Sequence, residues 1–106
     1  MKIKNVWMTL ITEKQYDALV KAGYGGEIPI VKLFVGPLTW LVTGIDDDGI
    51  LYGWADISQG CVEWGGLVSV DELPFIRQGP FMLERDLHFK HKDGAKYGSM
   101  DTLTGI

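Results

Sequence analysis

The fold is decided by residues 30–70, which read IVKLFVGPLTWLVTGIDDDGILYGWADISQGCVEWGGLVSV. Across this stretch β-branched and aromatic residues recur with a period of two, which is typical of strands. The pattern is interrupted by turn-forming residues at Gly36-Pro37, Asp46-Asp47-Asp48-Gly49 and Ser58-Gln59-Gly60. The stretch therefore predicts an antiparallel meander of four strands, at Val31 to Val35, Thr39 to Ile45, Ile50 to Ile57 and Cys61 to Val70.

Aromatic side chains alternate along the third and fourth predicted strands. The residues that share a face are Tyr52 and Trp54 of the third strand, and Val62, Trp64 and Val68 of the fourth. Aromatic pairs across these strands are therefore expected. In the preferred interpretation this face forms the core against a helix, and the alternative is an aromatic binding platform. The Gly65-Gly66 pair predicts a bend or bulge in the fourth strand.

A helix is predicted before the meander, over Glu13 to Ala22. Thr12 is a favourable N-cap, and Gln15 completes a capping box three residues later. Gly23 is expected to end the helix. Its apolar residues recur at helical spacing, so one face should pack against the sheet, and these residues are Tyr16, Leu19 and Val20.

Two more elements are predicted after the meander. A short helix begins near Ser69 or Asp71 and runs towards Ile76, where Pro74 is tolerated only in the first turn. A last strand covers Phe81 to Phe89, and the tail from His91 is expected to fray. Residues 1–106 thus predict a single α+β domain, an antiparallel meander of four to five strands packed by an N-terminal helix and a short second helix.

The composition is that of a folded domain, with 46% hydrophobic and 23% charged residues. Cys61 is the single cysteine, which excludes an intramolecular disulfide and favours a reducing compartment. The apolar part of the first residues is too short for a secretory signal, and no apolar run approaches the roughly 20 residues that span a bilayer. The sequence therefore predicts a cytoplasmic protein that does not bind membranes.

Charge is distributed unevenly along the chain, whose formal net charge is −4. No Lys or Arg occurs between Leu33 and Ile76. A surface of one negative sign repels phosphate and attracts basic partners, which argues against direct nucleic-acid binding. The predicted partner is a basic protein surface, such as that of a nucleic-acid-binding host protein, contacted by Asp46, Asp47, Asp48, Asp56 and Glu63. The alternative is that these acids are solvated surface residues without a partner.

No metal or cofactor site is predicted. The Asp46-Asp47-Asp48-Gly49 stretch lacks the alternating ligands and final Glu of a calcium loop. His88 and His91 could share a metal only if their stretch were helical, but the pattern around His88 favours a strand, and no third ligand has matching spacing. A second candidate site, for an enzyme or a ligand-binding domain, comprises Glu84, Arg85, Asp86 and His88. There an Arg between two carboxylates either forms a structural ion pair or leaves a carboxylate for acid–base chemistry.

Several short segments together resemble a known family. They are Leu10-Ile11-Thr12, Ile30-Val31-Lys32-Leu33-Phe34, Thr39-Trp40, Leu51-Tyr52-Gly53, Ser69-Val70-Asp71-Glu72-Leu73 and Leu83-Glu84-Arg85-Asp86-Leu87-His88-Phe89. This pattern, over roughly Met8 to His91, is similar to a bacterial domain-of-unknown-function family of about 100 residues that occurs on plasmids, integrative elements and phages. The resemblance implies an accessory protein of a mobile element and brings no catalytic residues with it.

The charge pattern and the resemblance favour the same function. We expect a non-enzymatic, acidic protein-binding module, such as an inhibitor of a host CRISPR or restriction system. The alternatives are a small enzyme or ligand-binding domain at the Glu84 to His88 site, and self-association through an exposed edge strand or a Trp-rich face.

Overall fold

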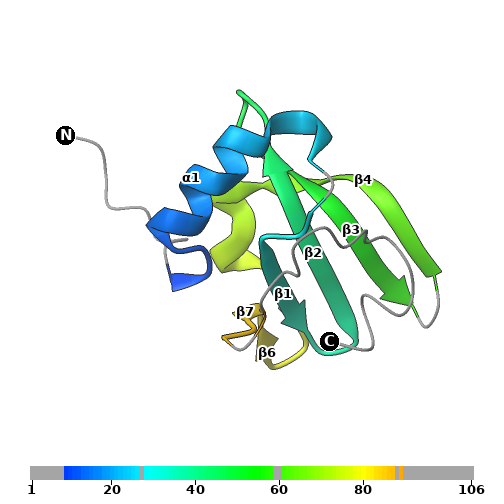
Figure 1. Ribbon diagram of the computed structural model, residues 1–106. Coiled ribbons are helices and arrows are strands. Elements are labelled where there is room, and N and C mark those ends of the chain that lie inside the picture. The colour runs from blue at the N-terminus through cyan, green and yellow to red at the C-terminus, as the bar shows by residue number, and fades with distance from the viewer. Residues whose placement is uncertain (1–8, 27, 59–60, 88, 90–106) are drawn as a thin grey trace.

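The meander predicted from the sequence forms the centre of the fold. The computed structural model describes residues 9–26, 28–58, 61–87 and 89. Its four long strands are β1 (Val31–Val35), β2 (Leu38–Ile45), β3 (Ile50–Ser58) and β4 (Cys61–Ser69). With β7 (Glu84–Arg85) they form one antiparallel sheet in the order β4-β3-β2-β1-β7 (Figure 1). The predicted α+β class is confirmed.

The helix α1 (Glu13–Ala22) begins and ends where its caps predict. The Thr12 side chain accepts a hydrogen bond from the Gln15 N–H at 3.0 Å, and the Gln15 side chain accepts one from the Thr12 N–H at 2.9 Å. Gly23 follows at φ 67°, the left-handed region that favours glycine, and a 3₁₀ turn, η2 (Gly23–Gly25), continues the chain. The prediction that Val20 packs against the sheet is wrong. The Val20 side chain is 52% exposed, because a helical step of about 100° carries it away from the buried Leu19.

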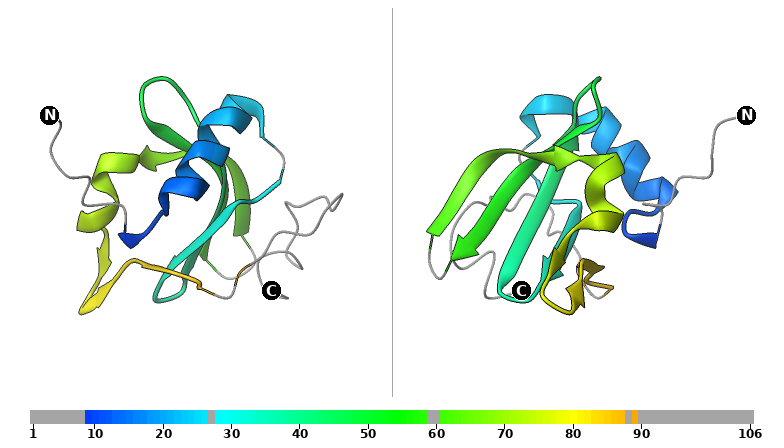
Figure 2. Two further views of the ribbon diagram at one scale, coloured as in Figure 1. Left: turned by 60° about the vertical axis from the view of Figure 1, so that its left-hand side comes forward. Right: turned by 180° about the vertical axis from the view of Figure 1, so that it is seen from behind.

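The core lies between the sheet and two helical segments, α1 and the 3₁₀ helix η3 (Val70–Phe75) (Figure 2). Leu19 of α1 and Leu73 of η3 are fully buried in it. The sheet contributes one face, whose core residues are Val31, Leu33, Val35, Trp40, Val42, Ile45, Leu51 and Ala55. The interpretation of the Tyr52 and Trp54 face as core is therefore wrong, because Leu51 and Ala55 occupy the helix side of β3 and place those aromatic residues on the other side.

The segment after the meander differs from the prediction in two ways. The second helix is of the 3₁₀ type, and Pro74 is its fifth residue rather than part of its first turn, which a short 3₁₀ turn tolerates because it has few internal hydrogen bonds to lose. The prediction of a single strand from Phe81 to Phe89 is wrong. Instead β5 (Arg77–Gln78) pairs with β6 (Phe81–Met82) as a separate hairpin, and β7 pairs with β1. Buried Leu83 separates β6 from β7, and so the chain changes partner there. The tail from His91 lies outside the described residues.

The end of α1 passes directly over β2 at a glycine. A methyl group on Gly44 would lie 3.0 Å from the Gly23 carbonyl carbon and closer still to its oxygen. The missing side chain lets the chain cross β2, and the ring of Tyr24 in η2 then contacts the Tyr52 ring edge-on at 4.8 Å. This crossing fixes where the helix sits relative to the sheet.

Candidate functional site

The acidic hairpin between β2 and β3 is held together by one of its own carboxylates. Asp46 Oδ1 accepts hydrogen bonds from the Asp48 and Ile50 N–H groups, both at 2.9 Å, and Oδ2 accepts one from the Tyr52 hydroxyl at 3.0 Å. The Ile50 N–H is the main reason that the pKa of Asp46 lies below 3.8, and the bond to Asp46 raises the pKa of Tyr52 above 10.0. Asp46 is therefore a structural residue of the turn, as an Asx-turn predicts.

The five acids predicted to form one surface are divided between two ends of the sheet. Asp47 and Asp48 are exposed at the hairpin, whereas Asp56 lies six residues along β3 from Ile50, or about 20 Å at strand spacing. Glu63 is near Asp56 along the sheet, but it pairs with Ala55 and so points to the opposite face from Asp56. Asp56 is half-buried, and among the described residues its Oδ1 has no hydrogen-bond partner.

The second candidate site lies on the other edge of the sheet. Glu84 and Arg85 form β7, and they point to opposite faces because they are consecutive in a strand. Asp86 is paired with Lys32, through an ion pair of 3.6 Å and a backbone hydrogen bond from its N–H to the Lys32 carbonyl at 2.9 Å. His88 lies outside the described residues. The structure therefore places Asp86 in an ion pair with Lys32, and strand alternation puts Glu84 and Asp86 on one face and Arg85 on the other.

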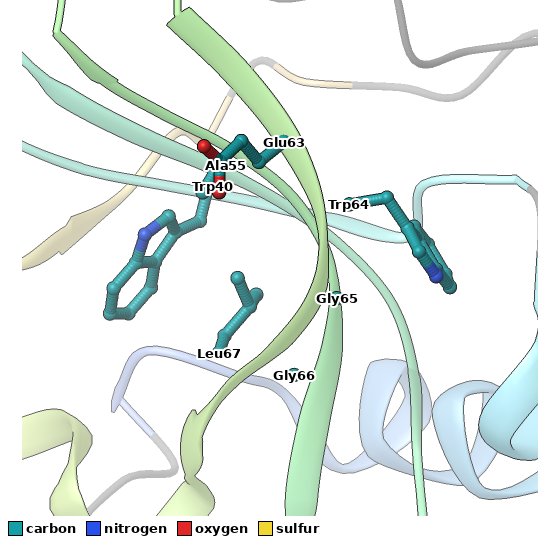
Figure 3. A pocket seen from close by; sticks show the side chains of 7 residues that line it. All are labelled: Trp40, Ala55, Glu63, Trp64, Gly65, Gly66 and Leu67. Atoms are coloured by element: carbon teal, nitrogen blue, oxygen red, sulfur yellow. The ribbon is translucent and has the colours of Figure 1, made fainter.

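A pocket lies against β4, at the end of the sheet that carries Glu63. Its volume is about 240 Å³, and it is lined by Trp40, Ala55, Glu63, Trp64, Gly65, Gly66 and Leu67. Figure 3 shows Trp40 and Leu67 on one side of the β4 ribbon and the Trp64 ring on the other. The Glu63 carboxylate lies on the Trp40 side (Figure 3), as expected from its pairing with Ala55, the residue that also pairs with Trp40.

The other side of β4 presents an aromatic pair. Trp54 and Trp64 are directly opposite each other, and their rings are 5.3 Å apart at an angle of 58°. The predicted cross-strand aromatic pairing is thus confirmed. Trp64 remains 40% exposed, and within the described chain the Trp54 indole nitrogen is buried without a hydrogen-bond partner. This face therefore combines the exposed Trp64 ring, the Trp54 indole N–H and the half-buried Asp56 carboxylate.

At this end of the sheet a carboxylate lies beside apolar and aromatic side chains. Within residues 9–26, 28–58, 61–87 and 89, no three His, Cys, Asp or Glu side chains gather as a metal site requires. Glu63 is exposed on the rim of a small aromatic pocket, an arrangement that suits a cationic group with an apolar stem. The sequence pattern indicates Glu63 and Trp64 but not Trp40 and Leu67 as residues of this site, and its one signal for the pocket is the Gly65-Gly66 pair.

Comparison with known proteins gives a family but no annotated relative. A family model described as a protein of unknown function, DUF2958, matches residues 4–97. This confirms the resemblance to a domain-of-unknown-function family. Neither the curated proteins nor the solved structures contain a match. Among the described residues, none of the helices has the length and apolar character needed to cross a membrane.

Proposed function

The chain belongs to the DUF2958 family of proteins of unknown function, and we propose that it is a non-enzymatic module that binds a basic surface of another protein. Its binding site is the end of the sheet where β3 and β4 carry Asp56, Glu63 and Trp64. The observation that carries this proposal is the pocket beside β4, whose lining includes the exposed residue Glu63 together with Trp40 and Trp64.

The charge of the surrounding surface supports a basic partner. No Lys or Arg is present between Leu33 and Ile76, so β3, β4 and η3 carry acids without any basic residue, and β2 is uncharged. Glu63 and the η3 acids Asp71 and Glu72 are exposed. A field of one sign speeds the approach of a basic protein and disfavours nucleic acid.

We place the protein among the accessory proteins of mobile elements, acting on a nucleic-acid-binding protein of the host, such as a component of CRISPR or restriction. An acidic domain that occupies a basic groove competes with nucleic acid for the same positive charges. This mechanism needs no catalytic residue.

The division of the acids between two ends of the sheet provides a matched test. We would compare pull-downs at low salt from a bacterial lysate with the parent protein, Glu63→Gln and Asp47→Asn, and identify bound proteins by mass spectrometry. Both substitutions remove one exposed negative charge, so a general effect of net charge is equal in the two. The proposal expects a basic protein that is retained by Asp47→Asn and lost with Glu63→Gln.

Two results would contradict the proposal. One is a bound protein that is insensitive to Glu63→Gln and to moderate salt, since exposed charges interact weakly beyond about 10 Å at 0.1 M ionic strength. The other is recovery of the protein alone. Loss with Asp47→Asn and retention with Glu63→Gln would move the site to the hairpin.

A further inference from the structure

We propose that the partner binds as an extended strand added to the free edge of β4. This inference rests on the proposed function and specifies the form of the partner, a peptide segment in which basic and apolar residues alternate. In such binding, backbone hydrogen bonds provide affinity and pockets for alternate side chains provide specificity.

The edge itself is long and open. β4 has nine residues and is the last strand of the sheet, and in the described part of the chain no strand pairs with its outer side (Figure 1). The opposite edge differs, because β7 contributes only two residues. An edge strand presents unpaired N–H and C=O groups, and proteins commonly protect it with Lys or Pro. β4 contains neither residue, and Glu63 is its one charge.

The middle of β4 carries two glycines, which leave the sheet faces there uncovered by side chains of β4 itself. Gly65 and Gly66 have no side chains, and a methyl group on Gly65 would contact nothing within 4 Å. On Gly66 it would meet only the Ile50 and Tyr52 side chains, at ordinary contact distances of 3.5 Å or more. Glycines within a strand often mark a place where a ligand or another backbone approaches closely. The two glycines lie beside the pocket, so one approaching segment reaches the edge and the pocket together.

The side chains of β4 specify what an added strand presents. Side chains of a strand alternate between faces, so alternate residues of the segment lie on the Glu63 side and on the Trp64 side. A Lys or Arg suits the first side, where its stem enters the pocket lined by Trp40 and Leu67 and its charge meets Glu63. An apolar or aromatic residue suits the second side, against the exposed Trp64 ring.

The size of the pocket favours a single side chain. Its volume of about 240 Å³ is below the roughly 300–1,000 Å³ that small-molecule sites occupy. A second copy of the chain is a poorer occupant, because each copy carries a net charge of −4 and its β4 offers no cation to Glu63. The structure thus favours a basic segment of another protein.

A designed peptide tests the inference directly. The probe is acetyl-Val-Lys-Val-Lys-Val-Lys-Val-amide, with a Val-Glu peptide of the same length as its control, and binding is measured by calorimetry and by amide hydrogen exchange. We expect binding that is at least about 10-fold weaker for the Val-Glu peptide and roughly 5-fold weaker for Glu63→Gln, the fold-change of an ion pair near 1 kcal/mol. Asp47→Asn serves as the matched charge control. Amides of β4 should become protected when the peptide is present.

Methylation of the peptide backbone separates strand addition from a purely electrostatic contact. Only alternate residues of an added strand direct their N–H groups towards the edge. N-methylation of the central Val residues and of the central Lys residues should therefore have opposite outcomes, with binding abolished in one peptide and retained in the other. Equal loss or equal retention would overturn the inference.

The two proposals fail in different ways. If a basic protein is captured through Glu63 but the methylated peptides show no alternation, the partner binds in another form and the proposed function stands. If neither the lysate nor the Val-Lys peptide provides a Glu63-dependent partner, both proposals fail. A dimer that the peptide dissociates would identify a second copy as the occupant and overturn the choice of partner.

Discussion

Gly44→Ala tests the crossing of α1 over β2, on which the arrangement of the fold depends. The added methyl would lie 3.0 Å from the Gly23 carbonyl carbon and closer to the carbonyl oxygen, so both atoms that it meets are backbone atoms. A flexible side chain could rotate away, but the η2 turn and β2 can only move apart. That movement also disturbs the Tyr24–Tyr52 contact and the packing of Leu19.

The expected cost is at the upper end of the range for overpacked sites, about 3 kcal/mol. A domain of this size has a free energy of unfolding of roughly 5–15 kcal/mol, so the substitution should remove a large part of it. At about 4–8 °C per kcal/mol, the melting temperature should fall by more than about 10 °C. Thermal unfolding followed by circular dichroism and urea titration measure both quantities.

Gly66→Ala is the matched control for this substitution. It makes the same change in a strand of the same sheet, but its methyl group would have Tyr52 Cε2 as nearest neighbour at 3.5 Å. Its free energy of unfolding should change by no more than about 0.5 kcal/mol. If Gly44→Ala melts within about 2 °C of the parent and of Gly66→Ala, the close approach of η2 to β2 is wrong.

Two further predictions concern local hydrogen bonds. Asp46 has a folded pKa below 3.8, so its carboxylate stabilises the fold above its unfolded pKa, and this contribution disappears as the pH falls through the folded pKa. Asp46→Asn should therefore flatten the loss of stability between about pH 5 and 2, and urea titrations with the same pH dependence as the parent would contradict this. Thr12→Ala removes the hydroxyl that accepts the Gln15 N–H and should lower the free energy of unfolding by about 1 kcal/mol, whereas Thr12→Ser should be nearly neutral; equal unfolding curves for the two would refute the cap.

Local signals in the sequence predicted the elements whose determinants are local. The cap and end of α1 depend on Thr12, Gln15 and Gly23, which are all within a few residues of the helix. The hairpin at Asp46 likewise closes on its own backbone. The strands after Phe81 could not be predicted in this way, because they depend on pairing with other strands. β6 pairs with β5, whereas β7 pairs with β1.

The periodic pattern also could not predict which face of the sheet is buried. β3 has apolar residues at both phases of its alternation, with Leu51 and Ala55 on one side and Tyr52 and Trp54 on the other. The period of two therefore predicts a strand without identifying its core face. The pocket could not be predicted from the sequence either, because Trp40 and Leu67 come from different strands and meet only in the folded sheet.

Folding and binding can be separated because their determinants lie in different parts of the sheet. Gly44 acts where α1 crosses β2, while Glu63 is an exposed residue of the edge strand with no described part in the core. Glu63→Gln should therefore leave the melting temperature unchanged while it weakens binding. Any binding defect of Gly44→Ala should instead disappear at temperatures where the variant is fully folded. If Glu63→Gln lowers stability as much as affinity, the carboxylate supports the fold, and the β4 edge is not the binding site.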